Sequence, residues 1–361
     1  MTCDLKVYAK NLEETAREQI DALAAFEAFD GCRVRIMPDA HAGAGCVIGF
    51  TANLGDKVVP NLVGVDIGCG MYAVPIEEPD DWVQFDRGVR KAVPSGFSVH
   101  GDETCDVTQL GLGCLGDLEG VDRLNRSLGT LGGGNHFIEV DRADDGTFWL
   151  VVHSGSRNLG KQVAEIYQRM ARADMEGSVP KGLEYLTGER AASYLADMAL
   201  CQAWARENRE RMVAQLFERR VVIPSGRDFH TVHNYIGDDG IVRKGAISAR
   251  DGERVLIPFN MRDGAVIGKG LGNEDWNWSA PHGAGRVMSR AKARKTLRME
   301  DFEGQMEGIY SSSVRAATLD EAPMAYKPAS EILDALAPTV EVESRLAPVY
   351  NFKAVEKRGR R

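Results

Sequence analysis

The sequence predicts an α+β fold, organised as a single large domain of mixed β-sheets with flanking helices. Glycine-broken β-branched runs and amphipathic stretches both occur along the 361 residues, but they alternate too irregularly for a doubly wound sheet. No stretch rich in proline or serine divides the chain, and no internal repeat is found. With 43% hydrophobic residues, the chain can bury a large core. We therefore expect one domain over residues 1–361, with a disordered basic tail at 354–361.

The first part of the chain predicts one helix followed by buried strands. Residues 11–28 have apolar side chains at helical spacing, which predicts an amphipathic helix. β-branched runs at 47–50 and 58–65 are broken by glycine and predict buried strands with turns between them. The glycine-rich stretch 95–130 is less regular, and we expect it to form a loop over the functional site.

The second part predicts a strand, two helices and then a run of short strands. The apolar residues 148–152 form a predicted strand that presents His153 at its carboxyl end. A short helix is expected at 161–173, and the longest helix at 190–220. Short strands and glycine turns are expected up to Asp275, followed by a helix over 286–297.

The composition indicates a globular protein that stays in the cytoplasm. No apolar run approaches the ~20 residues of a membrane helix, and the N-terminus lacks the residue order of a signal peptide. Seven scattered cysteines favour neither a disulfide framework nor a paired-cysteine zinc site. The net charge of −9 argues against a protein that coats nucleic acid, but it is compatible with a local basic groove. We expect no membrane partner, and a monomer or weak homo-oligomer.

Five short phrases, most of them rich in glycine, give the best indication of function. Four of the seven histidines and one cysteine lie in them, where the backbone can bend around an ion. The phrases are Asp66-Ile67-Gly68-Cys69-Gly70, Gly132-Gly133-Gly134-Asn135-His136, His153-Ser154-Gly155-Ser156-Arg157, His233-Asn234-Tyr235 and Pro281-His282-Gly283-Ala284-Gly285-Arg286. A metal site is the first hypothesis and a phosphate-handling site the second. Phrases so far apart in the chain can meet only in one integrated fold.

Asp66 and Cys69 are three residues apart on a glycine-bent turn, so both side chains can point at one place. A carboxylate and a thiolate together suit a transition metal such as manganese, zinc or cobalt, and the thiolate can bridge two ions. The alternative is a buried strand that ends in a tight turn with a structural cysteine. Both interpretations stay open from these residues alone.

The phrase around His136 and the one around His153 combine imidazoles with groups that bind anions. Three glycines precede Asn135 and His136, and Glu139 follows, but no Lys-Ser/Thr pair marks a phosphate-binding Walker loop. A flexible hairpin turn would account for the glycines but not for the adjacent polar residues. His153 is followed within four residues by Arg157, whose guanidinium suits phosphate oxygens.

The remaining histidines differ in how specific their settings are. His233 follows an apolar strand, where a histidine is more often a buried core residue than a ligand, and His230 has only that interpretation. His282 precedes a predicted helix, and a neutral imidazole at a glycine-rich helix start is a candidate nucleophile toward phosphorus. The alternative for this phrase is an ordinary helix-entry turn.

These motifs, in their order along the chain, strongly resemble the RtcB-type RNA-splicing ligases. The similarity runs from about residue 30 to about residue 353 and suggests a short, bacterial-like member of that family. It includes two further phrases that contain no proposed ligand, one near the beginning of the chain and one near its end. They are Met37-Pro38-Asp39-Ala40-His41-Ala42-Gly43-Ala44-Gly45 and Asp320-Glu321-Ala322-Pro323-Met324-Ala325-Tyr326-Lys327.

The resemblance implies an RtcB-like fold with a central dinuclear metal cleft, and an RNA ligase that uses GTP and two Mn²⁺ ions. RNA ends with a 3′-phosphate or a 2′,3′-cyclic phosphate are activated with GMP and joined to 5′-hydroxyl ends, in RNA repair or tRNA splicing. His282 would carry the GMP as a phosphoramidate. The metal ligands implied are Asp66, Cys69 and His136 for one ion, and Cys69, His153 and His233 for the other, with the Cys69 thiolate as the bridge.

The resemblance also implies a guanylate site and contacts with the RNA phosphates. The residues implied at the guanylate site are Asn135, Phe137, Glu139, Ala284, Gly285 and Lys353. Arg157 and Arg286 would meet the RNA phosphates. The chain departs from the family pattern at residues 258–263, where Pro-Phe-Asn-Met-Arg-Asp replaces an expected Pro-Gly-Ser-Met-Gly, which puts phosphate contacts there in doubt.

Two other functions are compatible with the same residues. One is a metal-dependent guanylyltransferase that caps RNA ends, or a phosphoesterase, neither of which completes ligation. The other is a non-catalytic protein that binds RNA ends. The presence of His282 favours nucleotidyl transfer over plain hydrolysis, and the intact set of predicted ligands disfavours the non-catalytic alternative.

Overall fold

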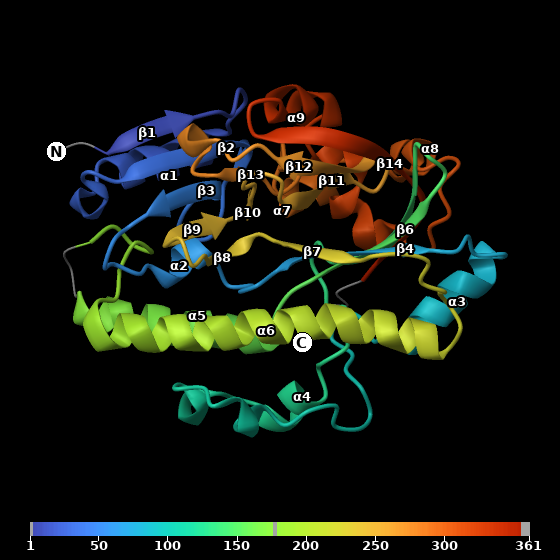
Figure 1. Ribbon diagram of the computed structural model, residues 1–361, viewed down its shortest axis with the longest axis horizontal. Helices are drawn as coiled ribbons and strands as arrows, with labels where there is room; N and C mark the ends of the chain where they lie inside the picture. The colour runs from blue at the N-terminus through green and yellow to red at the C-terminus, as the bar shows by residue number, and fades with distance from the viewer. Residues whose placement is uncertain (1–2, 176–178, 355–361) are drawn as a thin grey trace.

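A computed structural model of the protein describes residues 3–175 and 179–354, and its strands form two large sheets and one small sheet (Figure 1). The first large sheet has the order β1 (Asp4–Val7), β2 (Arg33–His41), β3 (Ile48–Asn53), β9 (Ile241–Lys244), β8 (Asn234–Ile236). The second has the order β11 (Arg254–Asn260), β12 (Gly264–Gly270), β14 (Val340–Lys353), β5 (Phe137–Ala143), β6 (Phe148–Ser154), β4 (Gly70–Ile76), β7 (Phe229–Val232). The small sheet pairs β10 (Ala246–Ser248) with β13 (Ser279–Pro281).

Helices flank these sheets, so the predicted α+β class is confirmed. The two longest helices, α5 (Arg157–Asp174) and α6 (Gly188–Glu218), run side by side below the sheets in Figure 1 and pack against each other. The helices are α1 (Glu14–Ala24), α2 (Pro60–Val63), α3 (Trp82–Ala92), α4 (Val121–Asn125), α5 (Arg157–Asp174), α6 (Gly188–Glu218), α7 (Arg290–Thr296), α8 (Met299–Gln305) and α9 (Ala329–Leu336). One apolar core lies between α6 and the second sheet, where Met212 and Leu216 join Val74 and Val152. Burial of such side chains stabilises the fold by about 1.5–3 kcal/mol each.

The second sheet curls until its two edge strands approach each other. The backbone nitrogen of Leu256 on β11 donates to Thr231 Oγ1 on β7 at 3.1 Å. The inner face of the curl holds a second apolar cluster, which includes Phe137, Ala143 and Leu256. Because side chains alternate along a strand, the odd-numbered residues of β5 point into this interior.

Two predictions about the first half of the chain are wrong. Residues 58–65 do not form a strand, since Pro60 begins the short helix α2 and Gly64, with φ of +93°, ends it. Proline suits the first turn of a helix because its missing N–H needs no partner there. The stretch 95–130 does not cover the site. It packs on α6, where Asp197 accepts from the backbone nitrogens of Gly113 and Cys114, and it lies below the long helices in Figure 1.

The other predicted elements are present with shifted ends. The helix expected at 11–28 is the shorter α1, those expected at 161–173 and 190–220 are α5 and α6, and the strand expected at 148–152 is β6, which includes His153. The tail predicted at 354–361 lies, from residue 355 onward, outside the described residues. Within residues 3–175 and 179–354, no helix is both long enough and apolar enough to cross a membrane.

Candidate functional site

Four adjacent strands of the second sheet bring sequence-distant side chains to one edge. His136 directly precedes β5, His153 lies at the end of β6, Cys69 directly precedes β4, and His233 directly follows β7. The neighbouring strands are antiparallel, so the start of each lies beside the end of the next. The strand order itself therefore gathers the four side chains, as the metal hypothesis requires.

Asp66 completes this cluster of titratable side chains, which is mostly buried. The Oδ2 atom of Asp66 lies 2.9 Å from His136 Nε2, and Cys69 Sγ lies 3.5 Å from the same nitrogen. Cys69 Sγ is also 3.2 Å from His153 Nε2. Two sets of three residues each have ligand atoms within 4.8 Å of one another, and Cys69 belongs to both sets. The sets are Asp66, Cys69 and His136, and Cys69, His153 and His233.

The protonation states of the cluster suit a bound cation. Burial lowers the pKa values of His153 and His233 well below the usual value, so both imidazoles are neutral and keep a lone pair. The Nδ1 atoms of these two histidines are buried without a hydrogen-bond partner among the described residues. For His136, Nδ1 donates to the Leu131 carbonyl at 2.8 Å, which leaves Nε2 facing the cluster. A neutral imidazole can offer the lone pair of one ring nitrogen to a cation, and for His153 the nitrogen that faces Cys69 is Nε2.

Cys69 differs from the histidines because its favoured state without a cation is the neutral thiol. Burial raises the pKa of Cys69 well above its ordinary value, and the charge of Asp66 adds to the effect. A metal ion reverses this preference, since thiols lose their proton on coordination. Binding of a divalent cation should therefore release a proton from Cys69.

Helix α6 supports the cluster from below through two residues that sequence reasoning missed. The buried Arg209 donates to the carbonyls of Gly68 at 2.9 Å and Ser154 at 2.7 Å, and these residues adjoin Cys69 and His153. Asn208 accepts from the backbone nitrogens of Gly129 and Thr130. No signal in the long helical pattern separates these residues from ordinary core positions, because their partners are backbone atoms of distant segments.

His282 approaches the cluster from the opposite side and is held by Asp39 on β2. Its Nδ1 atom lies 2.6 Å from Asp39 Oδ2, and the same oxygen accepts from the backbone nitrogens of His282 and Gly283 at 3.2 Å each. The His282 ring is centred 4.8 Å from the His233 ring. His282 Nε2 is thus the ring nitrogen that remains available beside the predicted metal ligands.

The helix predicted to open at His282 does not begin there. Residues 282–289 follow β13 as a loop, and α7 starts only at Arg290, with the Ser289 hydroxyl as its cap. Gly285, with φ of +73°, bends this loop against β2, and a Cβ atom there would lie 2.0 Å from the Asp39 carbonyl oxygen. The helix-terminus environment expected for His282 is therefore wrong, and Asp39 takes its place.

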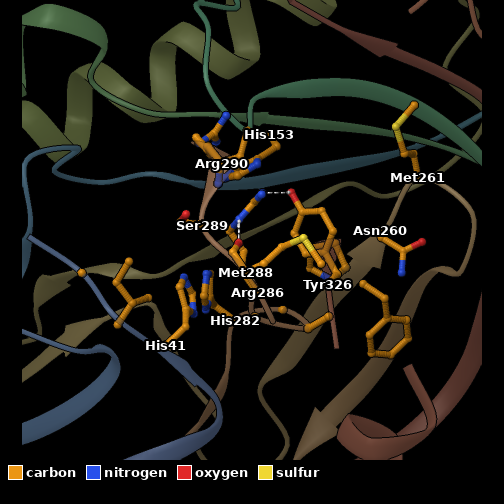
Figure 2. Close-up of a pocket in the computed structure, with 18 of the residues that line it drawn as sticks. His41, His153, Asn260, Met261, His282, Arg286, Met288, Ser289, Arg290 and Tyr326 are labelled. Carbon is orange, nitrogen blue, oxygen red and sulfur yellow. Dashed lines mark hydrogen bonds between the residues drawn. The ribbon is translucent and has the colours of Figure 1, made fainter. Parts of the chain in front are cut away.

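A cavity of about 780 Å³ opens beside His282 and His153. Figure 2 shows His41 and His282 side by side at this cavity. Arg286 and Tyr326 lie between this pair of histidines and Asn260 in the same view. All six residues implied for the guanylate site line it, namely Asn135, Phe137, Glu139, Ala284, Gly285 and Lys353. The structure thus joins the candidate nucleophile, the candidate nucleotide residues and one candidate metal ligand in one space.

Comparison with known proteins assigns the chain to a family. The family model described as tRNA-splicing ligase RtcB matches residues 19–111 and 117–354. The protein belongs to the RtcB family. A relative named RNA-splicing ligase RtcB, from Escherichia coli strain K12, is 30% identical, and the alignment covers 97% of each chain. Another, named tRNA-splicing ligase RtcB, from Thermococcus kodakarensis, is 28% identical over 87% of this chain and 86% of the relative.

The segment that departs from the RtcB pattern, residues 258–263, lines the cavity in part. It forms the end of β11 and the turn to β12, and Asn260 and Met261 are among the residues that line the cavity (Figure 2). Arg262 is held by Asp263, through Nε at 2.6 Å from Oδ1, and by Gln305. The Asn260 amide donates to Asp263 at 2.8 Å and accepts from the backbone nitrogens of Arg262 and Asp263 at 3.0 Å each. In this RtcB protein both the amide and the cation of the segment are therefore engaged by other protein groups.

The two arginines that the RtcB resemblance assigns to RNA have different surroundings. Arg286 lines the cavity, and its guanidinium donates to the Asp320 carbonyl at 2.7 Å and to the Tyr326 hydroxyl at 3.3 Å. Arg157 is not among the residues that line the cavity, and its Nε donates to Thr130 Oγ1 at 3.0 Å. Contact with RNA stays a prediction for both residues.

The wall of the cavity contains a buried ion-pair network. Lys353 Nζ lies 2.9 Å from Glu321 Oε2, and Arg290 lies 2.8 Å from the other carboxylate oxygen. Burial alone would raise the pKa of Glu321, but the charges of Lys353, Arg290 and Arg286 lower it to about 2. Glu321 and Tyr326 belong to the RtcB-like phrase at 320–327, for which sequence reasoning assigned no role.

Proposed function

We propose that this protein is a GTP- and manganese-dependent RNA ligase that joins 3′-phosphate or 2′,3′-cyclic phosphate ends to 5′-hydroxyl ends. The observation that carries the proposal is the position of His282. It lies at a cavity large enough for a nucleotide, beside the predicted metal ligands, with its Nδ1 atom held by a buried carboxylate. Membership of a family whose relatives are named RNA-splicing ligases supports the same function.

In the proposed reaction, His282 Nε2 attacks the α-phosphorus of GTP. A nitrogen–phosphorus bond forms, the bond to the bridging oxygen breaks, and pyrophosphate leaves. A 2′,3′-cyclic phosphate is first opened by water, which breaks the bond from phosphorus to O2′ and leaves a 3′-phosphate. An oxygen of the RNA 3′-phosphate then displaces the histidine and takes the GMP. The 5′-hydroxyl of the second RNA loses its proton and attacks that 3′-phosphate, so that a phosphodiester forms and GMP leaves.

Asp39 performs two tasks in this proposal. Its carboxylate holds the Nδ1 side of the imidazole, so the lone pair of Nε2 points away from β2 toward the cavity. The negative charge also stabilises the imidazole as it gains positive character during attack, as a buried aspartate does beside a catalytic histidine. The backbone bonds from His282 and Gly283 to Asp39 keep this geometry fixed before GTP binds.

The donor set of the cluster fits two manganese ions. Asp66, Cys69 and His136 would hold one, and Cys69, His153 and His233 would hold the other, with Cys69 as the shared ligand. Bound ions supply positive charge that screens the triphosphate and the departing pyrophosphate. The cavity residues Asn135, Phe137 and Glu139 would contact the guanylate, and Lys353 would contribute a cation from the cavity wall.

The test is to incubate the protein with manganese and GTP labelled in the α-phosphate, with and without RNA that carries 3′-phosphate and 5′-hydroxyl ends. We expect an acid-labile, alkali-stable protein adduct in the wild type and in His100→Ala, whose imidazole contacts the Gly129 carbonyl away from the cavity. His282→Ala should form none. An undiminished adduct in His282→Ala, or no adduct in the wild type, would disprove the proposal.

The same experiment separates ligation from its alternatives. Joined RNA supports the ligase, whereas an adduct and GMP-capped RNA without joined product would indicate a guanylyltransferase. Loss of the terminal phosphate without any adduct would indicate a phosphoesterase. Binding of RNA ends without any of these products would indicate a non-catalytic protein.

A further inference from the structure

Asp141 is a buried carboxyl group whose oxygens have no donor among the described residues. It is 0% exposed, and neither of its oxygens accepts a hydrogen bond from a described group. It lies on β5 two residues beyond Glu139, on the face that points into the curled sheet. Its neighbour Ala143 on that face and Trp149, which lies opposite Asp141 on β6, both belong to the apolar cluster inside the curl. A bare carboxylate would be very costly in such a place.

The group that contacts Asp141 is the carboxyl of Glu139, which lines the nucleotide cavity. On the neighbouring strand β14, Asn351 donates to Glu139 Oε2, and Lys353 is the charged group that faces Glu139. Lys353 is itself paired with Glu321. On the other side, β6 places Val151 opposite Glu139 and Trp149 opposite Asp141. Glu139 thus shares the cation Lys353 with Glu321, whereas Asp141 has only apolar Trp149 opposite it on β6.

Two carboxyls in contact in such surroundings cannot both be ionised near neutral pH. Burial, followed by the charge of Glu139, raises the pKa of Asp141 well above its ordinary value. Burial also raises the pKa of Glu139, to about 7, although Asn351, Lys353 and Asp141 oppose that rise. Above about pH 7 the pair therefore keeps one proton, and the carboxyl with the apolar neighbours keeps it.

We propose that Asp141 is a positioning residue that keeps this proton and donates it in a hydrogen bond to Glu139, so that Glu139 faces the nucleobase as an acceptor-only carboxylate. This inference rests on the proposed use of a guanine nucleotide. Guanine presents N–H donors at N1 and at its exocyclic amine, which an ionised carboxylate accepts. Adenine presents a lone pair at N1, which the same carboxylate repels. The pair thereby selects guanine over adenine.

Matched substitutions at Asp141 separate this role from simple packing. Asp141→Val removes the donor and leaves an apolar side chain of β-forming type among apolar neighbours. Glu139 then loses a hydrogen bond that favours its ionised form, so its pKa rises further. GTP binding should weaken about threefold at pH 7.5 and recover as the pH is raised, since a rise of one unit from a pKa of about 7 lowers the ionised fraction of Glu139 at that pH about threefold. Asp141→Asn, whose amide still donates, should restore most of the lost affinity.

The measurement is isothermal titration calorimetry with GTP and with ATP, in manganese, between pH 6.5 and 9. A control is Arg142→Gln, which changes the exposed neighbour on the opposite face of β5. Equal weakening of Asp141→Val at every pH, or equal losses in the valine and asparagine variants, would overturn the proposal. A GTP-to-ATP preference that stays the same in Asp141→Val would also overturn it.

A second measurement needs no nucleotide and tests Asp141 separately from the proposed function. Infrared difference spectra of the nucleotide-free protein should contain the carbonyl band of a protonated carboxylic acid at pH 8, and Asp141→Asn should lack that band. Absence of the band in the wild type would disprove the shared proton. Presence of the band together with no GTP binding would support the protonated Asp141 and disprove the proposed nucleotide instead.

Discussion

Asp39 Oδ2 lies 2.6 Å from His282 Nδ1, across 243 positions of sequence that separate strand β2 from the loop after β13. The carboxylate is fully buried, and the same oxygen accepts from two backbone nitrogens of the His282 loop. The imidazole is therefore oriented by a residue of strand β2 and not only by the loop that contains it. In the proposed reaction, the direction of the nucleophile is decided by a residue that never touches GTP.

The first prediction concerns this orientation. Asp39→Asn should slow formation of the GMP adduct by about 10²-fold, because misplacing a reacting group by about 1 Å costs that much. Single-turnover rates at saturating GTP would measure the effect, and the affinity for GTP should change little. Circular dichroism melting shows whether the variant is folded. A folded variant with a wild-type rate would contradict the assigned role of Asp39.

The second prediction concerns Cys69, which both candidate ligand sets share. Cys69→Ala should lose manganese from both positions and abolish adduct formation. Metal content by mass spectrometry, compared with adduct yield, would measure this loss. Cys105→Ala is the control, since Cys105 is a half-buried cysteine bonded to the Asn125 carbonyl and belongs to neither set. Full metal content and activity in Cys69→Ala would refute the bridging role.

The third prediction concerns the support that Arg209 gives to the cluster. Its guanidinium donates to the carbonyls of Gly68 and Ser154, next to two predicted ligands. Arg209→Met should weaken manganese binding by about 10- to 100-fold, as loss of a group that orients ligands does. Arg206→Met on the same helix is the matched control, because Arg206 is exposed and pairs with Glu210. Equal manganese affinities in both variants would exclude this supporting role.

The fourth prediction concerns the pH dependence of stability. Burial, together with the charges of Arg209 and Arg206, lowers the pKa of His230 to about 3. The unfolded chain binds a proton at this residue below about pH 6.5, whereas the folded protein does not, so stability falls as the pH falls. Between pH 7 and 5 this one histidine removes about 2 kcal/mol from the free energy of unfolding.

Denaturant unfolding at the two pH values would test the contribution of His230. His230→Gln, which cannot gain a proton, should lose about 2 kcal/mol less than the wild type between pH 7 and pH 5. His100→Gln is the comparison variant, because His100 contacts the Gly129 carbonyl and not the residues around His230. If His230→Gln has the same pH dependence as the wild type, the neutral state assigned to His230 in the folded protein is wrong.

Much of the candidate site could be predicted from sequence because each residue lies in a distinctive phrase. The phrases around Asp66, His136 and His153 combine glycine with rare polar residues, and the structure brings these side chains together. Their role as metal ligands stays a prediction. Asp39 and Arg209 could not be found from the sequence because each contacts a partner far along the chain, which leaves no local pattern. Asp141 lies only two residues from Glu139, but its role depends on burial without a donor, which the sequence does not reveal.

Local errors had a similar origin. Residues 58–65 are β-branched and read as a strand, but Pro60 starts a helical turn that the surrounding tertiary contacts hold. The glycine-rich stretch 95–130 is predicted to cover the site, but it packs on α6, where Asp197 accepts from the backbone nitrogens of Gly113 and Cys114. The phrase around His282 predicts a helix start, but its contacts with Asp39 and the turn at Gly285 bend it against β2 as a loop.

The sequence by itself determined the α+β class, the family resemblance and the identity of the candidate ligands and nucleophile, because these depend on residue types in short segments. Only the tertiary structure decided which carboxylate orients His282, which cation supports the cluster, and that Asp141 shares a proton with Glu139. These relationships depend on which atoms lie within about 3 Å of each other in the folded chain. They also depend on burial, which sets the charge that each group carries.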